Sequence, residues 1–271
     1  MDPAKQLDFD ARESACSDDR TARSQRVVRF MLLSGGLKTT KRTGWVRSGV
    51  ALPESVADHS HRCALAALLA APHAGADAAR ACLVALAHDL AECIVGDMTP
   101  DDPRGKAEKQ RLEESAMATL GGALRPHAMG EFIPALWREY EGGGGASASP
   151  EAALAKDVDK FEMALQALEY ERAQPELDLS PFYDSVRGRI RGAEVQAWFD
   201  EVLRLRDEML RERRGGARGA GGTAARAKKG AAKPPRVFSA GDVIAAALWG
   251  AGVGAVSSLL VIAGMRVLAK R

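Results

Sequence analysis

The fold of this chain is decided by one stretch of sequence, Ala81-Cys82-Leu83-Val84-Ala85-Leu86-Ala87-His88-Asp89-Leu90-Ala91-Glu92. The stretch is almost wholly apolar, so a helix formed by it would be buried, and His88 and Asp89 would be buried with it. Burying an ionised carboxylate without a partner is very costly. A divalent metal would be such a partner, because imidazole and carboxylate groups both ligate these metals. A buried pair between Asp89 and an arginine or an amide is the alternative.

Further candidate ligands lie on both sides of this stretch. His59 is found upstream, in the run 53–62, and Asp157 and Asp159 are found downstream, in the run 156–160. A histidine, a His-Asp pair and a distant aspartate can surround one ion if three helices bring them together. Two imidazoles and two carboxylates suit a divalent ion and leave positions for water and substrate.

The periodicity of the apolar residues predicts an all-α body, and no run shows the alternation typical of a strand. Ser55, with Asp58 three residues later, predicts a helix that starts with a capping box, and Asp77 is a candidate N-cap. A glycine-rich run, 142–149, predicts a loop. We expect helices over residues 27–34, 55–71, 78–94, 106–120, 129–141, 151–170 and 195–214.

The helix expected over residues 151–170 carries two aspartates on different faces. Its apolar stripe consists of Leu154, Val158, Phe161, Leu165 and Leu168. Asp157 lies on the edge of this stripe, whereas Asp159 lies on the far side of the helix, among small and apolar residues. Periodicity alone therefore slightly favours Asp157 as the aspartate that faces the core.

Four motifs follow one another along the chain: Arg42-Thr43-Gly44-Trp45, Pro53-Glu54-Ser55-Val56-Ala57-Asp58-His59, His88-Asp89-Leu90-Ala91-Glu92 and Gly96-Asp97-Met98-Thr99-Pro100. In order and spacing they resemble the HD-domain 5'-deoxynucleotidases, of the HD domain-containing protein 2 type. The resemblance covers residues 25–211. It implies an HD-domain helical bundle that acts as a metal-dependent phosphomonoesterase. Such an enzyme hydrolyses deoxyribonucleoside 5'-monophosphates to a deoxynucleoside and phosphate.

The resemblance also implies which residues bind the metal. It selects Asp159, rather than Asp157, as the distant aspartate. One divalent ion (Mn, Co, Fe, Zn or Mg) is then expected to bind four ligands: His59, His88, Asp89 and Asp159. Among the family's catalytic carboxylates, Glu92 matches the acid/base residue and Asp97 matches another carboxylate near the site. A simple turn aspartate is the alternative for Asp97, because it directly follows a glycine.

Three upstream residues match the substrate-binding part of the family pattern: Arg42, Trp45 and Glu54. An arginine suits bidentate binding of a phosphate group. Related bacterial enzymes have that arginine directly before the tryptophan, whereas this chain has Gly44 there and Arg42 two positions earlier. Phosphate binding by Arg42 therefore requires its side chain to reach the site from that earlier position. Trp45 could line the nucleotide pocket, and packing in the core is the alternative.

The sequence is compatible with two other functions. HD domains also host nucleotide phosphodiesterases and triphosphohydrolases, although a single His-Asp pair favours one metal and a monoester substrate. A membrane-tethered nucleotide-binding protein without catalysis is the second alternative. The intact set of two histidines and two aspartates, with Glu92 beside it, argues against loss of activity.

The C-terminal part of the chain has a different character from the body. Residues 213–236 contain eight basic residues and no acidic one, and their glycine, alanine and proline content predicts a flexible linker. Residues 243–265 follow, a run of 23 uncharged residues. As a helix this run would be about 35 Å long, enough to cross a hydrocarbon core of about 30 Å. We expect a single-pass, C-terminal transmembrane helix with the catalytic domain in the cytosol, since basic flanks stay on that side. A soluble helix packed on the body is the alternative.

The composition of the chain supports several further predictions. Residues 1–24 are polar and charged, which predicts a disordered leader and no secretory signal. Residues 25–212 form the predicted HD domain. The formal net charge of the chain is +2 although the tail is strongly basic, so the body is acidic and no nucleic-acid polymer is expected as a partner. The four cysteines lack C-x-x-C spacing, which favours reduced thiols. The expected partners are deoxyribonucleoside 5'-monophosphates and a membrane, and the chain could form a homodimer.

Overall fold

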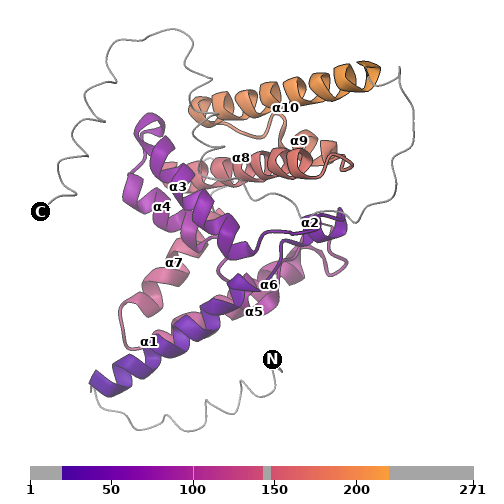
Figure 1. Ribbon diagram of the computed structural model, residues 1–271. Helices are drawn as coiled ribbons and strands as arrows, with labels where there is room; N and C mark the ends of the chain where they lie inside the picture. The colour runs from indigo at the N-terminus through magenta and orange to yellow at the C-terminus, as the bar shows by residue number, and fades with distance from the viewer. Residues whose placement is uncertain (1–19, 100, 143–147, 220–271) are drawn as a thin grey trace, which may run out of the picture. The chain divides into compact units, whose positions relative to one another are not determined.

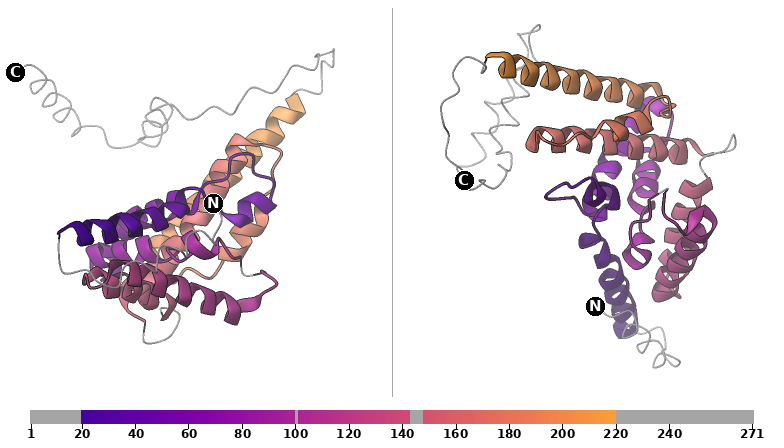
Figure 2. Two further views of the ribbon diagram at one scale, coloured as in Figure 1. Left: turned by 90° about the horizontal axis from the view of Figure 1, so that it is seen from below. Right: turned by 90° about the vertical axis from the view of Figure 1, so that its right-hand side faces the viewer.

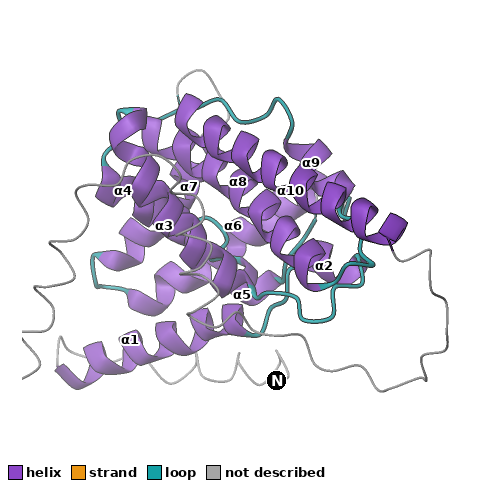
Figure 3. Cartoon of the chain, turned by 45° about the horizontal axis from the view of Figure 1, so that its top comes forward, coloured by secondary structure: helices purple, strands orange, loops and turns teal. Residues whose placement is uncertain are grey.

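The computed structural model describes residues 20–99, 101–142 and 148–219, and these residues form helices with no strand among them (Figures 1 and 3). Their order is α1 (Arg20–Ser34), η3 (Gly35–Lys38), α2 (Thr43–Arg47), α3 (Val56–Ala74), α4 (Ala78–Ala87), α5 (Glu92–Val95), α6 (Gly105–Leu124), α7 (Met129–Gly142), α8 (Pro150–Ala173), α9 (Ser180–Val186) and α10 (Ala193–Gly219). The predicted all-helical body is confirmed for this part of the chain.

Local sequence explains where the central helices begin. The Ser55 side chain accepts a hydrogen bond from the Asp58 backbone N–H while the Asp58 side chain accepts one from the Ser55 N–H, which is the predicted capping box of α3. The Asp77 side chain accepts from the Arg80 N–H at the start of α4. Ser149 caps α8 in the same way, with a proline in the first turn.

The core is built around α3, α4 and α8, which pack on one another. Their buried faces are rich in alanine, including Ala67 and Ala70 on α3, Ala85 on α4, and Ala155 and Ala167 on α8. Because alanine side chains are short, the three helices approach closely. Helices α9 and α10 cover α8, and α7 packs against α4 and α8. Polar side chains on α3, α4 and α8 can therefore meet across short distances.

A second apolar cluster joins α6 and α7 and lies beside α1. Its buried residues include Met117 and Leu120 on α6 and Trp137 on α7, and Phe30 and Leu33 of α1 pack against it. Figure 2 shows α1 running alongside α6, in agreement with their contacts. This cluster supports the side of the molecule on which α5 lies.

The segment between η3 and α3 is held by short backbone pairings. The Val56 N–H donates to the Thr40 carbonyl at 2.9 Å, and the Arg42 N–H donates to the Glu54 carbonyl at 3.2 Å. At the start of this segment, a Cβ on Gly36 would lie 2.7 Å from the Cys93 carbonyl oxygen. Only glycine allows η3 to pack this closely on α5. The pairings bring Arg42 next to the start of α3.

The central helix differs from the prediction. A continuous helix was expected over residues 78–94, but α4 ends at Ala87 and α5 begins at Glu92. Between them the chain turns with three-residue spacing: the Leu90 N–H donates to the Ala87 carbonyl and the Glu92 N–H to the Asp89 carbonyl. The residues around this turn are apolar, so hydrophobic periodicity could not detect the tighter winding.

The remaining differences are at the ends of the described region and in two short helices. Helix α1 begins at Arg20, inside the segment predicted as a leader, and α10 extends to Gly219, past the start of the predicted linker. Helices α2 and α9 were not predicted. In residues 20–99, 101–142 and 148–219, no helix has the length and apolar character needed to cross a membrane. The predicted transmembrane run, residues 243–265, lies outside the described residues.

Candidate metal and active site

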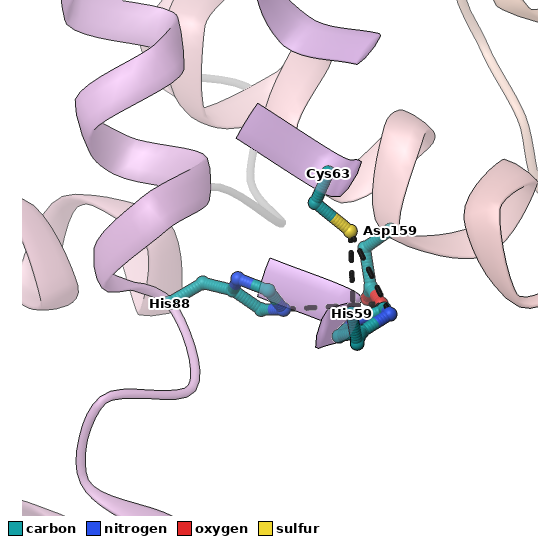
Figure 4. Close-up of side chains that lie close together, drawn as sticks. All are labelled: His59, Cys63, His88 and Asp159. Atoms are coloured by element: carbon teal, nitrogen blue, oxygen red, sulfur yellow. Dashed lines mark hydrogen bonds and ion pairs between the residues drawn. The ribbon is translucent and has the colours of Figure 1, made fainter. Parts of the chain in front are cut away.

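Four side chains from α3, the turn after α4, and α8 converge at one point: His59, His88, Asp89 and Asp159, which we call the His–Asp cluster. The Nε2 atom of His59 lies 3.3 Å from Oδ1 of Asp159 and 3.7 Å from Oδ2 of Asp89. The Nε2 atom of His88 lies 3.1 Å from the same Asp89 oxygen. Figure 4 shows the two imidazoles and Asp159 facing one another. The structure thus brings together all four residues predicted as metal ligands.

The two imidazoles are oriented by bonds on their other nitrogen. Nδ1 of His59 lies 2.5 Å from Oε2 of Glu162, and Nδ1 of His88 lies 2.6 Å from the Ala85 carbonyl oxygen. Both partners accept hydrogen bonds, so the Nε2 atoms are left facing the cluster. Nε2 of His88 is buried and makes no hydrogen bond. A buried imidazole nitrogen directed at two carboxylates fits a divalent metal, which takes nitrogen and oxygen ligands.

Both aspartates of the cluster are kept ionised. Burial alone would raise the pKa of Asp89, but His88 and Arg42 hold it well below its usual range. Burial acts on Asp159 in the same direction, and the two histidines of the cluster lower its pKa. The Tyr140 hydroxyl donates to Oδ2 of Asp159 at 2.8 Å, which leaves Oδ1 directed at His59. Ionised carboxylates are the form that binds a cation.

A cysteine lies at the edge of the cluster. Sγ of Cys63 is 3.6 Å from Nε2 of His59, one turn further along α3. Its thiol, His59, His88 and Asp159 each offer one ligand atom within 4.8 Å of the others. Burial raises the pKa of the Cys63 thiol to about 12, so it is protonated. Cys63 is a free, buried thiol in this structure.

Glu92 is a buried carboxyl group beside the cluster. It is only 2% exposed, and its Oε2 atom has no hydrogen-bond partner. Burial, followed by the negative charges of Asp89 and Asp97, raises the pKa of Glu92 well above its usual value. The three-residue turn places Glu92 above Asp89, because side chains three apart eclipse each other in such a turn. These effects favour the protonated form of Glu92 next to the candidate ligands.

Arg42 reaches the cluster in spite of its unusual position in the sequence. One terminal guanidinium nitrogen donates to Oδ2 of Asp89 at 3.1 Å. Burial would lower the pKa of Arg42, but Asp89 and Asp159 raise it above its usual range. Gly44 stands where the related bacterial enzymes have their arginine, and a Cβ there would lie 3.3 Å from the Phe182 ring. A larger side chain at position 44 would meet that ring.

Asp97 joins the end of α5 to the start of α2. Its side chain accepts a hydrogen bond from the Thr43 N–H, and its backbone carbonyl accepts one from the Thr43 hydroxyl at 2.8 Å. It also acts electrostatically on Arg42 and Glu92. Asp97 is thus close to the site, while its hydrogen bonds hold the loop that carries Arg42.

Trp45 and Glu54 form a hydrogen-bonded pair beside the site. Trp45 is 1% exposed and stacks on Phe182 with the ring centroids 4.1 Å apart, so its ring packs in the core. Its indole N–H donates to Oε1 of Glu54 at 2.9 Å. Burial and the charge of Glu162 raise the pKa of Glu54 to about 7. Glu54, His59 and Glu162 have their ligand atoms within 4.8 Å of one another. A contact of Trp45 or Glu54 with substrate stays a prediction.

Asp157 is buried, as the apolar stripe indicated, but it does not join the cluster. Its Oδ2 atom accepts hydrogen bonds from the backbone N–H groups of Arg191 at 3.0 Å and Gly192 at 2.8 Å. It therefore fixes the chain just before α10. Asp159 is the aspartate that meets the histidines.

Sequence reasoning missed three residues that contact the cluster: Glu162, Cys63 and Tyr140. Helical spacing could have identified two of them. Glu162 follows Asp159 by three positions on α8, and Cys63 follows His59 by four positions on α3, so each shares a face with a candidate ligand. No local signal in the sequence indicates that Tyr140 of α7 bonds to Asp159.

Comparison with known proteins points to the same family as the sequence motifs. The profile of the HD domain family matches residues 34–198. The 5'-deoxynucleotidase HDDC2 of Dictyostelium discoideum is 42% identical over 173 residues, which cover 60% of this chain and 88% of that protein. The 5'-deoxynucleotidase hdd1 of Schizosaccharomyces pombe is 39% identical over 192 residues, 69% of this chain and 93% of that protein.

A solved structure is also similar to this chain. A predicted metal-dependent phosphohydrolase from Magnetospirillum magnetotacticum superimposes with a TM-score of 0.52 at 28% identity. The superposition covers 68% of this chain and 97% of that protein.

Proposed function

This chain belongs to the HD domain family, and we propose that it is a metal-dependent 5'-deoxynucleotidase. It would hydrolyse deoxyribonucleoside 5'-monophosphates to a deoxynucleoside and inorganic phosphate. The relatives that carry this name match the chain over most of their own length. The observation that carries the proposal is the His–Asp cluster, with Arg42 on one of its carboxylates and the buried carboxyl group of Glu92, which has an unpartnered oxygen, beside it.

His59, His88, Asp89 and Asp159 would hold one divalent ion. Two imidazole nitrogens and two carboxylate oxygens are donors that Mn, Co, Fe and Zn accept, and Mg accepts the carboxylates. Such an ion would supply Lewis acidity to the phosphoryl group and to a water molecule. The four side chains would fix where the phosphate of the substrate binds.

Glu92 would move the proton that hydrolysis of the ester requires. The leaving deoxynucleoside oxygen must gain a proton when the bond from phosphorus to oxygen breaks. A carboxyl group with a raised pKa can donate it, and burial together with the charges of Asp89 and Asp97 raises the pKa of Glu92. Glu92 would then act as a general acid. Asp97 would help to keep that proton in place through its negative charge.

Arg42 would bind the phosphate group. In the structure its guanidinium is paired with Asp89, and an arginine can contact a phosphate at the same time through its other N–H groups. Glu54 and Trp45 would keep the loop around Arg42 in position, because Glu54 accepts from both the Arg42 backbone and the Trp45 indole. This gives each upstream residue a role in substrate binding without requiring the Trp45 ring to touch the nucleotide.

A phosphate-release assay of the full-length chain tests this proposal. Deoxyribonucleoside 5'-monophosphates, their ribose counterparts, the triphosphates and a phosphodiester would be offered with Mn, Co, Fe, Zn or Mg, and Asp89→Ala would be the control. We expect release from deoxyribonucleoside monophosphates that requires an added metal and is lost in Asp89→Ala. Release from triphosphates or diesters alone would replace the proposed substrate. Metal binding without any hydrolysis would indicate a binding protein.

For the tail we retain the arrangement expected from the sequence. The part of the predicted basic linker that follows α10, residues 220–236, would connect to residues 243–265, which would anchor the chain in a membrane by its C-terminus. The body would then face the cytosol, since basic flanking residues favour that side. The support for this part of the proposal is the uncharged length of the run and the basic residues that flank it.

A further inference from the structure

One buried carboxylate next to the His–Asp cluster has no part in the function proposed above. Glu162 of α8 is 1% exposed, and its Oε2 atom lies 2.5 Å from Nδ1 of His59, which is itself fully buried. A buried carboxylate is costly unless every oxygen has a strong partner. The pair formed by Glu162 and His59 therefore requires a physical reason.

Arg62 provides the partner for the second oxygen of Glu162. Its Nε atom donates to Oε1 at 2.8 Å, and a terminal nitrogen lies 2.6 Å from the same oxygen. Each oxygen of Glu162 thus has its own partner, Arg62 on one side and His59 on the other. Since the guanidinium is always protonated, its pairing keeps Glu162 in the carboxylate form.

The opposite end of Arg62 is held by two more residues of α8. Its terminal nitrogens donate to Glu169 at 2.8 Å and 2.9 Å and to Gln166 at 2.5 Å. Glu162, Gln166 and Glu169 lie on consecutive turns of one helix face, so α8 holds the guanidinium at three points. The orientation of Arg62, and through it that of Glu162, is fixed by the helix.

The consequence for His59 is a fixed ring and a fixed proton. A carboxylate only accepts hydrogen bonds, so Nδ1 of His59 carries a proton toward Glu162, and Nε2 is the nitrogen that faces Asp159 and would bind a metal. His88 differs, because its Nδ1 is bonded to the neutral carbonyl of Ala85. A charged acceptor makes an imidazole a stronger donor to a metal than a neutral one does.

We propose that Glu162, held by Arg62, is the positioning residue of His59 and raises the affinity of the His–Asp cluster for a divalent metal. The inference rests on the metal dependence proposed above, but not on the identity of the substrate. Glu162 does not touch the substrate or the reacting atoms. It acts only by orienting the imidazole and increasing its basicity.

The test compares Glu162→Gln with the matched control Glu169→Gln. Both glutamates contact Arg62, but only Glu162 contacts His59. Co²⁺ affinity of the full-length chain would be measured by competition with a chelator. We expect Glu162→Gln to bind Co²⁺ about 10- to 100-fold more weakly. Glu169→Gln keeps Glu162 intact, and its amide oxygen can still accept from Arg62, so we expect it to bind like the parent chain. Equal affinity in the Glu162→Gln and parent proteins would overturn the proposal.

A spectroscopic readout separates positioning from a general loss of structure. In the Co²⁺-bound chain, each ligating imidazole that keeps an N–H on Nδ1 gives an exchangeable, strongly shifted proton resonance. We expect two such resonances, and we expect Glu162→Gln to move the one from His59 while leaving the one from His88. The parent chain alone also tests the proposal if the variant does not fold. Absence of the His59 resonance from the parent spectrum would contradict it.

The test of Glu162 does not depend on the result of the phosphate-release assay. A parent chain that binds Co²⁺, and loses affinity in Glu162→Gln, supports the role of Glu162 even if it releases no phosphate from any deoxynucleotide. That combination would contradict the proposed function and leave the positioning role in place.

Discussion

Asp157 and Asp159 are two positions apart on α8, and their carboxylates bind different parts of the protein. Asp157 accepts hydrogen bonds from two backbone N–H groups just before α10, whereas Asp159 faces Nε2 of His59. One helix thus carries a structural aspartate on one face and a candidate metal ligand on another.

This separation predicts different consequences for two matched variants. Asp159→Asn should abolish metal binding and phosphate release, because it removes a charged ligand. Asp157→Asn should keep both and lower the free energy of unfolding by about 1–2 kcal/mol, since bonds to a charged acceptor become bonds to a neutral one. Elemental analysis and urea unfolding measure the two effects. If Asp157→Asn lost the metal and Asp159→Asn kept it, the assignment of the ligand would be wrong.

A second pair of variants separates metal binding from proton transfer. Asp89→Ala should lose both the metal and the activity, because Asp89 lies close to both histidines. Glu92→Gln should keep the metal and the fold, but its rate should fall by about 10²–10⁴-fold, the usual contribution of a general acid. Metal content and single-turnover rates give the answer. Loss of metal from Glu92→Gln would make Glu92 a ligand instead.

The role of Arg42 can be tested with a variant that keeps the positive charge but lacks the guanidinium group. Arg42→Lys removes the planar fork that contacts Asp89 and would contact the phosphate, and a charged hydrogen bond lost in this way costs about 1.5–3 kcal/mol. We therefore expect kcat/KM to fall by about 10- to 100-fold. Arg47→Lys is the control, because Arg47 is exposed and pairs with Asp101 on the surface. Similar kcat/KM values for both variants would remove Arg42 from phosphate binding.

Glu113 of α6 predicts a pH dependence of stability. Burial raises the pKa of Glu113 from an ordinary value of 4.5 to about 7. Between these values the unfolded chain releases this proton and the folded chain keeps it, so the stability from Glu113 declines as the pH rises. Relative to Glu113→Gln, the parent chain should lose unfolding free energy from pH 4.5 to about 7 and then level off. If the difference in unfolding free energy between the parent chain and Glu113→Gln did not change over this pH range, the shifted pKa would be contradicted.

The predicted membrane anchor can be tested with three proteins. The full-length chain should stay in the membrane pellet after carbonate extraction, and a 1–236 truncation should be soluble. Val256→Arg places a charge in the middle of the run 243–265, which costs about 2.5–3.5 kcal/mol in a membrane helix. We expect it to weaken retention. Full-length protein in the soluble fraction would show that the run packs as a helix on another surface.

The sequence predicted those parts of the fold and site that depend on local chemistry. Helix starts at Ser55 and Asp77 were predictable because an N-cap needs only a side-chain oxygen and a nearby N–H group. The four candidate ligands were identified by residue type and motif order, and they do lie together. Whether they bind metal, and which roles their neighbours have, stay predictions.

Other features depend on tertiary contacts that periodicity does not describe. The turn at His88 replaces one long helix because the chain winds more tightly there, and apolar residues on both sides conceal it. Trp45 was an open choice between pocket and core, and the stacking partner that places its ring in the core, Phe182, is distant in sequence. Asp157 and Asp159 show the limit most clearly. The apolar stripe correctly indicated burial for Asp157, but burial did not identify the ligand.

The convergence of four polar side chains in the His–Asp cluster also has a thermodynamic consequence. The unfolded chain cannot hold these side chains together, so a divalent ion binds the folded form preferentially. Mass action then raises the free energy of unfolding, by about 2.7 kcal/mol when the free ion is at 100 times its dissociation constant. Because the unfolded fraction is what proteases remove, the supply of the ion would control how much of this protein a cell retains. Metal availability would thus set the abundance of the enzyme as well as its activity.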